Sequence, residues 1–419
     1  MILVGQNFPD QRLTDIPGEV RRELNSSDFG TGLAPGSLVA IGVGSRGISN
    51  IDVIARAVVD LWKSRQCVPF IFPAMGSHGA ATAEGQTDVL AHYGITQETM
   101  GCEIRSSLDV VDLGRSPEGI EVFLDRHASG ASGVFLVGRI KQHTDFAGKI
   151  ESGLYKMMAI GLGKWAGAKN YHMHARRIGL EAVIRSVGRQ VLSSGKILGG
   201  LAILEDAYHN TAKLAAVPAA NMEAREEELL ALSKTWAATL PCDLDLLIVD
   251  EMGKIYSGAG MDTKIVNRGV DGEINPWPGL PHVERIFVRG LSSRSYGNAS
   301  GIGMAEVITD RLAAAIDNNA TWLNVLTATT PRCGKLPIHF PTDRECVERI
   351  APTLGKPNMA DVRIGWIPNT LAVSPIALSE NMRAEIESNP RLTILGEPSE
   401  LAFGADGNLL DLFGAPGDH

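Results

Sequence analysis

The 419-residue sequence lacks the features that mark secreted, membrane-spanning and nucleic-acid-binding proteins. Its five cysteines are scattered and never spaced as CxxC, so neither a disulfide framework nor a cysteine zinc site is expected. No run of about 18 apolar residues would span a membrane, and the start, MILVGQNFPDQRL, has no signal-peptide pattern. The net charge of −9 argues against nucleic-acid binding, which depends on excess Lys and Arg. We therefore expect a cytoplasmic protein with no nucleic-acid or membrane partner, and leave a homo-oligomer open.

The main pattern in the sequence is a series of short apolar runs, each of which ends in a polar, Gly-rich turn. The runs that read as buried strands are Leu38–Val43, Val68–Phe72, Gly133–Ile140 and Leu244–Val249. After the first, Ser49 and Asn50 are candidate caps for a helix over Ile51–Lys63. Strands that alternate with helices predict an α/β fold with mostly parallel, doubly wound sheets. In such sheets ligands bind beyond the carboxyl ends of the strands, where all these polar turns fall.

The length and a change of pattern near residues 236–243 predict two domains. We expect an N-terminal domain over 1–240, with 400–419 as a candidate addition to it, and a C-terminal α/β domain over 241–399. The active site is expected in the cleft between them. In the second half we predict strands at Arg285–Val288 and Trp322–Leu326, and helices at Ala305–Ile316 and Arg344–Ala351.

The first turn, Gly42–Gly47, matches GxGxxG between a strand and a helix, the context of a dinucleotide fingerprint. The acidic residue that should end the next strand and hold a ribose is missing, because that strand ends Phe72-Pro73-Ala74. Two other interpretations stay open: a plain Gly-rich turn, and an anion site built on the guanidinium of Arg46.

Two histidines follow buried strands. His78 lies between glycines in Gly76–Gly79, and His143 has Asp145 nearby to orient it. Imidazole is the natural proton carrier near neutral pH, and two imidazoles on opposite faces of one carbon would suit epimerisation. The alternative is that each histidine is structural or simply exposed.

Two lysines, Lys149 and Lys156, lie in an otherwise apolar, Gly-rich segment. Desolvation there would lower an amine pKa and favour a nucleophilic or covalently modified lysine, whereas the alternative is a surface lysine with a buried stem. Downstream, His172 and His174 form an HxH that would share a face on a strand and diverge on a helix. Histidine is a common ligand of nickel, zinc and copper.

In the second half, Lys254 and Lys264 flank a Gly-rich stretch, Ser257–Asp262. Either lysine could hold a substrate carboxylate, and the alternative is a β-turn with solvated lysines.

These motifs together resemble the nickel-pincer nucleotide-dependent lactate racemase family, most clearly over residues 35–180. The matching anchors, in order, are Ser45-Arg46, Gly76-Ser77-His78, Gln142-His143 followed by Phe146-Ala147-Gly148, Lys156 ahead of Ile160-Gly161, and His172 sixteen residues past Lys156.

The resemblance implies a cofactor and a set of roles. In that family a pyridinium thioamide-thiocarboxylate mononucleotide, the nickel-pincer nucleotide, holds Ni(II) and is tethered to a lysine, here Lys156. His172 would complete the nickel sphere, and His78 and His143 would alternate as base and acid. The substrate's Cα hydride would pass to the pyridinium ring and return to either face. The turn Gly44, Ser45 and Arg46 would contact cofactor or substrate, and cofactor-synthesis enzymes would be partners.

The sequence departs from the family pattern in three places, and these differences decide which substrate, lysine tether and nickel ligand we expect. Gly44 stands where the family tends to have acidic or polar residues. The segment from His143 to Lys156 is longer, which makes Lys149 a rival tether and His174 a rival ligand. The Gly-Tyr-Pro and Tyr-Gln signature of the substrate domain is not recognisable. We therefore expect a 2-hydroxy acid other than lactate, such as a sugar acid or a hydroxy dicarboxylate. An NAD-dependent oxidoreductase and a non-catalytic metal or nucleotide carrier are the alternatives.

Overall fold

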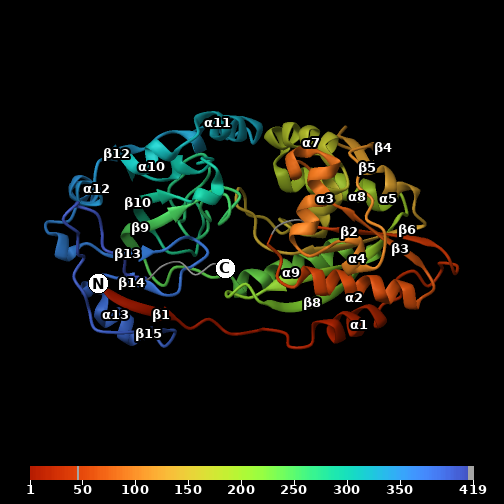
Figure 1. Ribbon diagram of the computed structural model, residues 1–419, viewed down its shortest axis with the longest axis horizontal. Coiled ribbons are helices and arrows are strands. Elements are labelled where there is room, and N and C mark those ends of the chain that lie inside the picture. Colours follow the sequence, from red (N-terminus) through yellow and green to blue (C-terminus); the bar gives the residue numbers. More distant parts are fainter. Residues whose placement is uncertain (45–46, 414–419) are drawn as a thin grey trace. The chain divides into compact units, whose positions relative to one another are not determined.

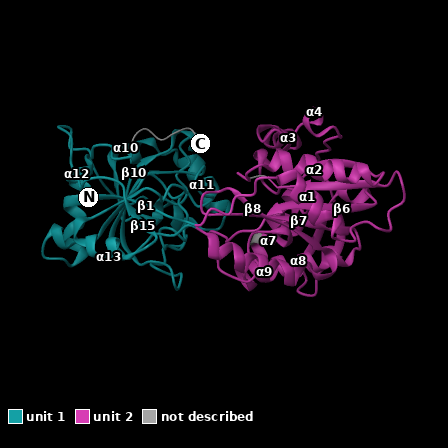
Figure 2. Cartoon of the chain, turned by 90° about the horizontal axis from the view of Figure 1, so that it is seen from below, with its two compact units in different colours: residues 1–8, 238–419 teal, residues 9–237 magenta. Residues whose placement is uncertain are grey.

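The chain folds into two units, coloured separately in Figure 2. The computed structural model describes residues 1–44 and 47–413, with the backbone but not the side chain of His172. Unit 1 comprises Met1–Phe8 and the chain from Ala238 onward, and unit 2 comprises Pro9–Ala237. The boundary at 237/238 lies close to the predicted 240/241. The first eight residues and the described part of the tail, 400–413, belong with the C-terminal unit, unlike the division expected from sequence.

Unit 2 is built on a five-stranded sheet in the order β3-β2-β6-β7-β8 (Figure 1). Its strands are β2 (Leu38–Val43), β3 (Val68–Pro73), β6 (Gly133–Arg139), β7 (Ile197–Glu205) and β8 (Thr211–Pro218). The first four in spatial order are mutually parallel, and β8 runs antiparallel to β7. The mixed, mostly parallel α/β fold predicted from the sequence is confirmed.

Helices cover both faces of this sheet, because its strands are apolar on both sides. On one face, Val39 and Ile41 pack with α1 (Ile16–Asn25) and α2 (Ile51–Ser64). On the other, Ala40 packs with α8 (Leu180–Ser193) and α9 (Met222–Trp236). Such alternation is what a doubly wound sheet requires. The remaining elements of unit 2 are α3 (Ala83–His92), α4 (Gln97–Met100), β4 (Val110–Arg115), β5 (Glu121–Asp125), α5 (Arg126–Gly130), α6 (Leu154–Lys156) and α7 (Lys164–Ile178).

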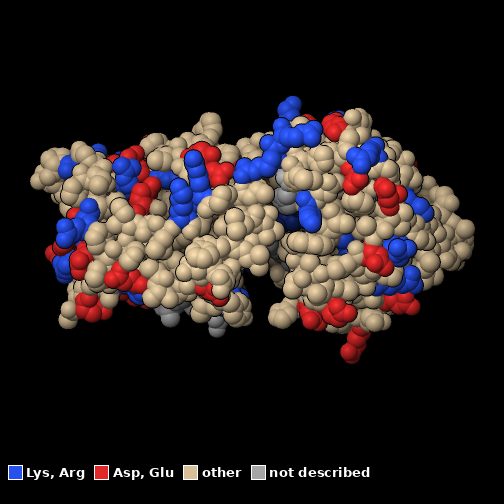
Figure 3. All heavy atoms as spheres, turned by 90° about the horizontal axis from the view of Figure 1, so that it is seen from above, with Lys and Arg blue, Asp and Glu red and all other residues tan. Residues whose placement is uncertain are grey.

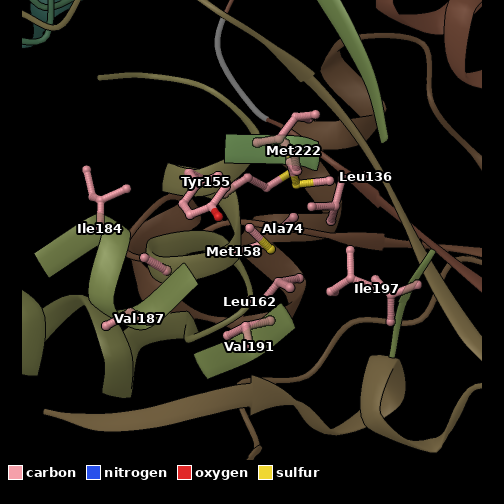
Figure 4. Close-up of a cluster of buried hydrophobic side chains, with 14 of the residues drawn as sticks. Ala74, Leu136, Tyr155, Met158, Leu162, Ile184, Val187, Val191, Ile197 and Met222 are labelled. Atoms are coloured by element: carbon pink, nitrogen blue, oxygen red, sulfur yellow. The ribbon is translucent and has the colours of Figure 1, made fainter. Parts of the chain in front are cut away.

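A π-helical turn, Met157–Gly161, joins α6 to α7. The segment is anchored by Tyr155, Met158 and Leu162, which lie in the core beside Ala74 and Leu136 (Figure 4). Isolated π turns occur often at functional sites. Lys156 therefore lies between two side chains, Tyr155 and Met157, that are fixed by packing.

Unit 1 contains an eight-stranded sheet in the order β12-β11-β10-β9-β13-β14-β1-β15. Its strands are β9 (Leu244–Met252), β10 (Val283–Leu291), β11 (Val307–Thr309), β12 (Ile338–Phe340), β13 (Ile364–Ile367), β14 (Ile376–Leu378), β1 (Ile2–Gln6) and β15 (Leu392–Ile394). The five from β12 to β13 are parallel, and β14, β1 and β15 add antiparallel pairs. Because β1 pairs with β14 and β15, the first residues of the chain belong to unit 1. Its helices are α10 (Asp310–Ala315), α11 (Asn318–Thr327), α12 (Asp343–Ile350) and α13 (Arg383–Ser388).

The segment 401–413 is part of the unit 1 core. Leu409 is 5% exposed, its amide donates to Asp343 Oδ2 at 3.0 Å, and Arg289 donates to its carbonyl at 2.8 Å. Phe413 meets Trp366 edge-on at 5.5 Å between ring centroids. These contacts explain why the tail does not join unit 2.

Two predicted elements of unit 1 are wrong. Trp322–Leu326, predicted as a strand, lies inside α11, and the predicted helix Ala305–Ile316 contains strand β11 before α10 begins. A short apolar run cannot be assigned to strand or helix by periodicity alone.

The surface that Figure 3 displays carries acidic and basic side chains interspersed. Many are paired, as where Arg185 contacts Glu181, Glu223 and Glu227 between α8 and α9. None of the helices in the described ranges is long and apolar enough to cross a membrane.

Candidate active site

The carboxyl ends of three neighbouring strands bring the predicted site turns of unit 2 to one edge of its sheet. The turn with His78 follows β3, Gly44 follows β2, and the loop with His143 follows β6. Neighbouring strands lie about 4.8 Å apart, so the ends of β3 and β6 are roughly 10 Å from one another. That spacing suits a small-molecule ligand that contacts both loops.

An ion pair that the sequence analysis missed supports the turn after β2. Arg139 and Glu205 end β6 and β7 and are bonded to each other. Arg139 donates to the carbonyl of Gly47 at 2.9 Å, and Glu205 accepts from the amide of Ser49 at 2.9 Å. Ser45 and Arg46 themselves lie outside the described residues. The feature of the sequence that could have indicated this ion pair is the arginine at the end of an otherwise apolar strand.

The same contacts count against a dinucleotide at Gly42–Gly47. The carboxylate of Glu205 already accepts from Ser49, beside the N-terminus of α2, where a phosphate would be bound. A Cβ on Gly42 would lie 3.0 Å from the Phe72 ring, so this glycine serves strand packing. Asn50 precedes α2 with a positive φ of 56° and makes no side-chain cap, contrary to the cap predicted there.

The turn that carries His78 is tightly constrained. Gln86, fully buried, donates to the carbonyls of Met75 and Gly76 at 3.2 and 3.0 Å. His78, half-buried, is followed by Gly79, and then by Ala80 and Ala81, both with positive φ. Left-handed backbone at alanine is strained, and such strain gathers at functional sites. Thr82 caps α3 by accepting from the amide of Gly85.

His143 is held inside its loop. The buried carboxylate of Glu151 accepts from the amides of His143 and of Gly148, and Lys234 pairs with it. The imidazole packs on Phe146, 4.7 Å between ring centroids, and is 9% exposed. Its Nδ1 accepts a hydrogen bond of 3.0 Å from the amide of Asp145.

This bond determines the tautomer of His143. Because Nδ1 accepts, the neutral ring carries its proton on Nε2 and presents an N–H donor there. To accept a proton at Nε2, the ring must change tautomer and lose its bond to Asp145. In this conformation His143 is therefore better suited to donate a hydrogen bond to a substrate oxygen than to act as a base.

The segment that carries Lys156 packs against residues that follow β2 and β3. The neighbour of this lysine, Met157, reaches Gly44, where an added Cβ would lie 3.1 Å from the Met157 Cε. A Cβ on Gly161 would lie 2.7 Å from the carbonyl oxygen of Ala74, which directly follows β3. Lys156 itself is half-buried. The segment thus brings this lysine close to the turns after β2 and β3.

A buried glutamate fixes the start of the Lys156 helix. Glu226 on α9 accepts from the amide of Tyr155 at 2.9 Å and is fully buried. Burial raises the pKa of Glu226 to about 7, against the opposing effect of the Tyr155 and Leu154 amides. A Cβ on Gly153 would lie 2.3 Å from the Glu226 Oε1, so only glycine fits there.

The rival tether, Lys149, is exposed, and its amide donates to Glu181 on α8 at 3.2 Å. His172 and His174 both lie on α7, so of the two cases predicted for the HxH the helical one applies. No group of three His, Cys, Asp or Glu side chains within the described ranges could hold a metal ion.

Lys254 and Lys264 lie in unit 1 beyond β9. Lys254 is half-buried and donates through Nζ to the Gly258 carbonyl at 2.6 Å. Lys264 is 5% exposed, and its ammonium lies 2.8 Å from the centroid of the Trp277 ring. Of the two, Lys254 is the more accessible to a substrate.

The fold and the polar turns define a two-unit α/β protein with a candidate active site at the carboxyl edge of the unit 2 sheet. The structure is similar to that of the lactate racemase apoprotein from Thermoanaerobacterium thermosaccharolyticum, with a TM-score of 0.53 and 14% sequence identity. The similarity covers 88% of this chain and 98% of that chain. At this identity it shows a shared, lactate racemase-like fold. No family model matches the sequence, and no curated protein does.

Proposed function

We propose that the protein is an isomerase, a racemase or epimerase of a 2-hydroxy acid, that uses a nickel-pincer nucleotide tethered to Lys156. The observation that carries the proposal is the gathering of the His78 turn, the His143 loop and the Lys156 segment at one sheet edge. The lactate racemase-like fold supports it.

The residues present fit such a cofactor. Lys156 is half-buried and lies on a helix whose start is fixed by Glu226, so a group attached to its Nζ would be held over the strand ends. His172 is the first candidate for a protein ligand to its nickel, and His174 is the rival. When bound, such a nucleotide supplies a hydride acceptor.

The protein's own groups would position the substrate and move its hydroxyl proton. His78, at the half-buried end of its turn, would take the proton from the hydroxyl oxygen as the Cα–H bond breaks, and return it when the bond re-forms. His143 would donate from Nε2 to the same oxygen, and a change of tautomer would let it exchange roles with His78. Arg46 would bind the substrate carboxylate, and Lys254 and Lys264 are the candidate anion-binding lysines of unit 1.

The substrate class follows from the second half of the chain. The lactate-type signature is missing, and Lys254 with the Ser257–Asp262 loop stands in that region. We propose a larger 2-hydroxy acid, such as a sugar acid or a hydroxy dicarboxylate.

Incubation of the loaded protein with single enantiomers in D₂O tests the reaction. Chiral chromatography should detect the opposite configuration, and mass spectrometry should find the original α-hydrogen retained, because a transferred hydride does not exchange with solvent. Deuterium at Cα would instead indicate proton abstraction by the histidines and contradict the hydride mechanism. The alternative, a non-catalytic carrier, would be indicated if none of the enantiomers were converted and if His78→Gln bound them as tightly as the wild-type protein does.

A further inference from the structure

A buried lysine beneath the site has no role in the reaction described so far. Lys164, the first residue of α7, is fully buried. Its ammonium donates to the carbonyl of Pro73 at 2.7 Å and to Gln86 Oε1 at 2.9 Å, and pairs with Asp125 Oδ2 at 3.4 Å. One side chain therefore joins β3, α3, β5 and α7.

These contacts lead directly to the candidate site. Pro73 ends β3, and Gln86, which accepts from Lys164, donates in turn to the carbonyls of Met75 and Gly76. The backbone from 73 to 76 is thus held by one continuous network, two residues before His78. The same ammonium fixes the first turn of α7, the helix that carries His172 and His174.

Stability alone is a poor explanation for this arrangement. Burial lowers the pKa of Lys164, opposed by the charge of Asp125, so the ammonium is held at a desolvation penalty. Buried ion pairs are often no more stabilising than well-packed apolar residues of the same volume. Lys164 also has a positive φ of 53°, a strained conformation for a residue with a Cβ. A buried network that carries a desolvation penalty and a strained backbone is expected where it fixes the geometry of a site.

We propose that Lys164 is a positioning residue that sets the place of the His78 turn relative to helix α7, with Asp125 and Gln86 as its partners. The functional meaning of this geometry rests on the proposed function, since it would hold the proton-transferring group and the metal ligand in register. The geometric claim stands without it.

The test uses the full-length protein with ¹³C-labelled histidine Cε1, whose signals are assigned by single His→Gln variants. The double variant Lys164→Met/Asp125→Asn removes the pair together, so no lone charge is left buried. Its control is Lys196→Met, which removes a comparable lysine–carbonyl bond, to Ala131 at 2.9 Å, at the opposite edge of the sheet. We expect the double variant to shift the signals of His78 and of the α7 histidines, and to leave those of His282 and His339 in unit 1 unchanged. The control should shift none of these.

A folded double variant with unmoved His78 and α7 signals would overturn the proposal. If the double variant does not fold, Gln86→Met decides, because it keeps the Lys164–Asp125 pair and the Lys164 bond to Pro73 while it removes the bonds of Gln86 to Lys164, Met75 and Gly76. It should shift the His78 signal, and an unmoved His78 signal overturns the proposal. In cofactor-loaded protein, nickel affinity should fall about tenfold in the double variant. Wild-type protein without nickel would refute the proposed function, while the histidine signals would still decide the role of Lys164.

Discussion

The side chains at the candidate site are held in different ways. His143 is 9% exposed and accepts at Nδ1 from the amide of Asp145, and Lys156 and His78 are half-buried. The sequence indicated all three, but it could not show that the amide of Asp145, rather than its carboxylate, sets the state of His143.

The tautomer of His143 is directly measurable. At a pH where the ring is neutral, two-bond ¹⁵N–¹H spectra should show the proton on Nε2, because Nδ1 accepts from Asp145. The variant Asp145→Pro lacks this amide donor and should admit the Nδ1–H form. A dominant Nδ1–H tautomer in the wild-type protein would contradict the arrangement described.

Glu226 should make stability depend on pH. Its pKa of about 7 in the folded state lies above the ordinary 4.5, so its favourable contribution is complete below pH 4.5. That contribution falls as pH rises through 7, by on the order of 3 kcal/mol. Denaturant unfolding of unit 2 between pH 4.5 and 8 should show this decline in the wild type and not in Glu226→Gln.

The exposed Glu228 on the same helix provides the control. Glu228→Gln should differ from the wild type by a constant amount over the whole pH range. A wild-type to Glu226→Gln difference that does not vary with pH would refute the assignment. The burial of Glu226 could have been predicted from the sequence, because helical spacing puts it on the same face as Met222, Leu229 and Leu230, which are buried.

At the scale of elements, the strands and helices that carry their own apolar pattern were predicted well. Leu38–Val43 is a strand as expected, and the helix predicted over Ile51–Lys63 ends one residue later, at Ser64. Strand β7 was missed because Gly199 and Gly200 interrupt its apolar run. Strand β1 was missed because its partners lie more than 370 residues away along the chain, and such pairing leaves no local signal.

The short helix that carries Lys156 should depend on Gly153. Gly153→Ala places a Cβ against the Glu226 carboxylate and should destabilise unit 2 by about 1–3 kcal/mol. Thermal unfolding measures the change. Gly130→Ala, where the added Cβ meets nothing within 4 Å, should stay within about 0.5 kcal/mol of wild type. Equal effects of the two substitutions would show that the close approach to Glu226 is not important.

Segment 401–413 should stabilise unit 1 specifically. Leu409→Ala removes a side chain that is 5% exposed and should destabilise that unit by about 2–4 kcal/mol, whereas Leu410→Ala, 56% exposed, should be nearly neutral. Hydrogen exchange analysed by unit is the measurement. Faster exchange in unit 2 for Leu409→Ala would contradict the assignment of this segment.

For the whole molecule, the sequence predicted the fold class, because it follows from the alternation of strands and helices. The expected boundary at 240/241 lies near the division between the two units at 237/238. The sequence did not predict which unit the two chain ends join, since that depends on strand pairing and tail packing. The catalytic and cofactor roles come from the resemblance, and the structure adds that the turns after β2, β3 and β6 lie at one edge of the unit 2 sheet.

Peptide mapping of the protein after coexpression with the cofactor-synthesis enzymes, combined with metal analysis, tests the central claim most directly. The account predicts a nucleotide-sized mass on the peptide containing Lys156, with one nickel per chain. Both should be lost in Lys156→Ala and kept in Lys149→Ala. An unmodified Lys156 in protein that carries no nickel would contradict it.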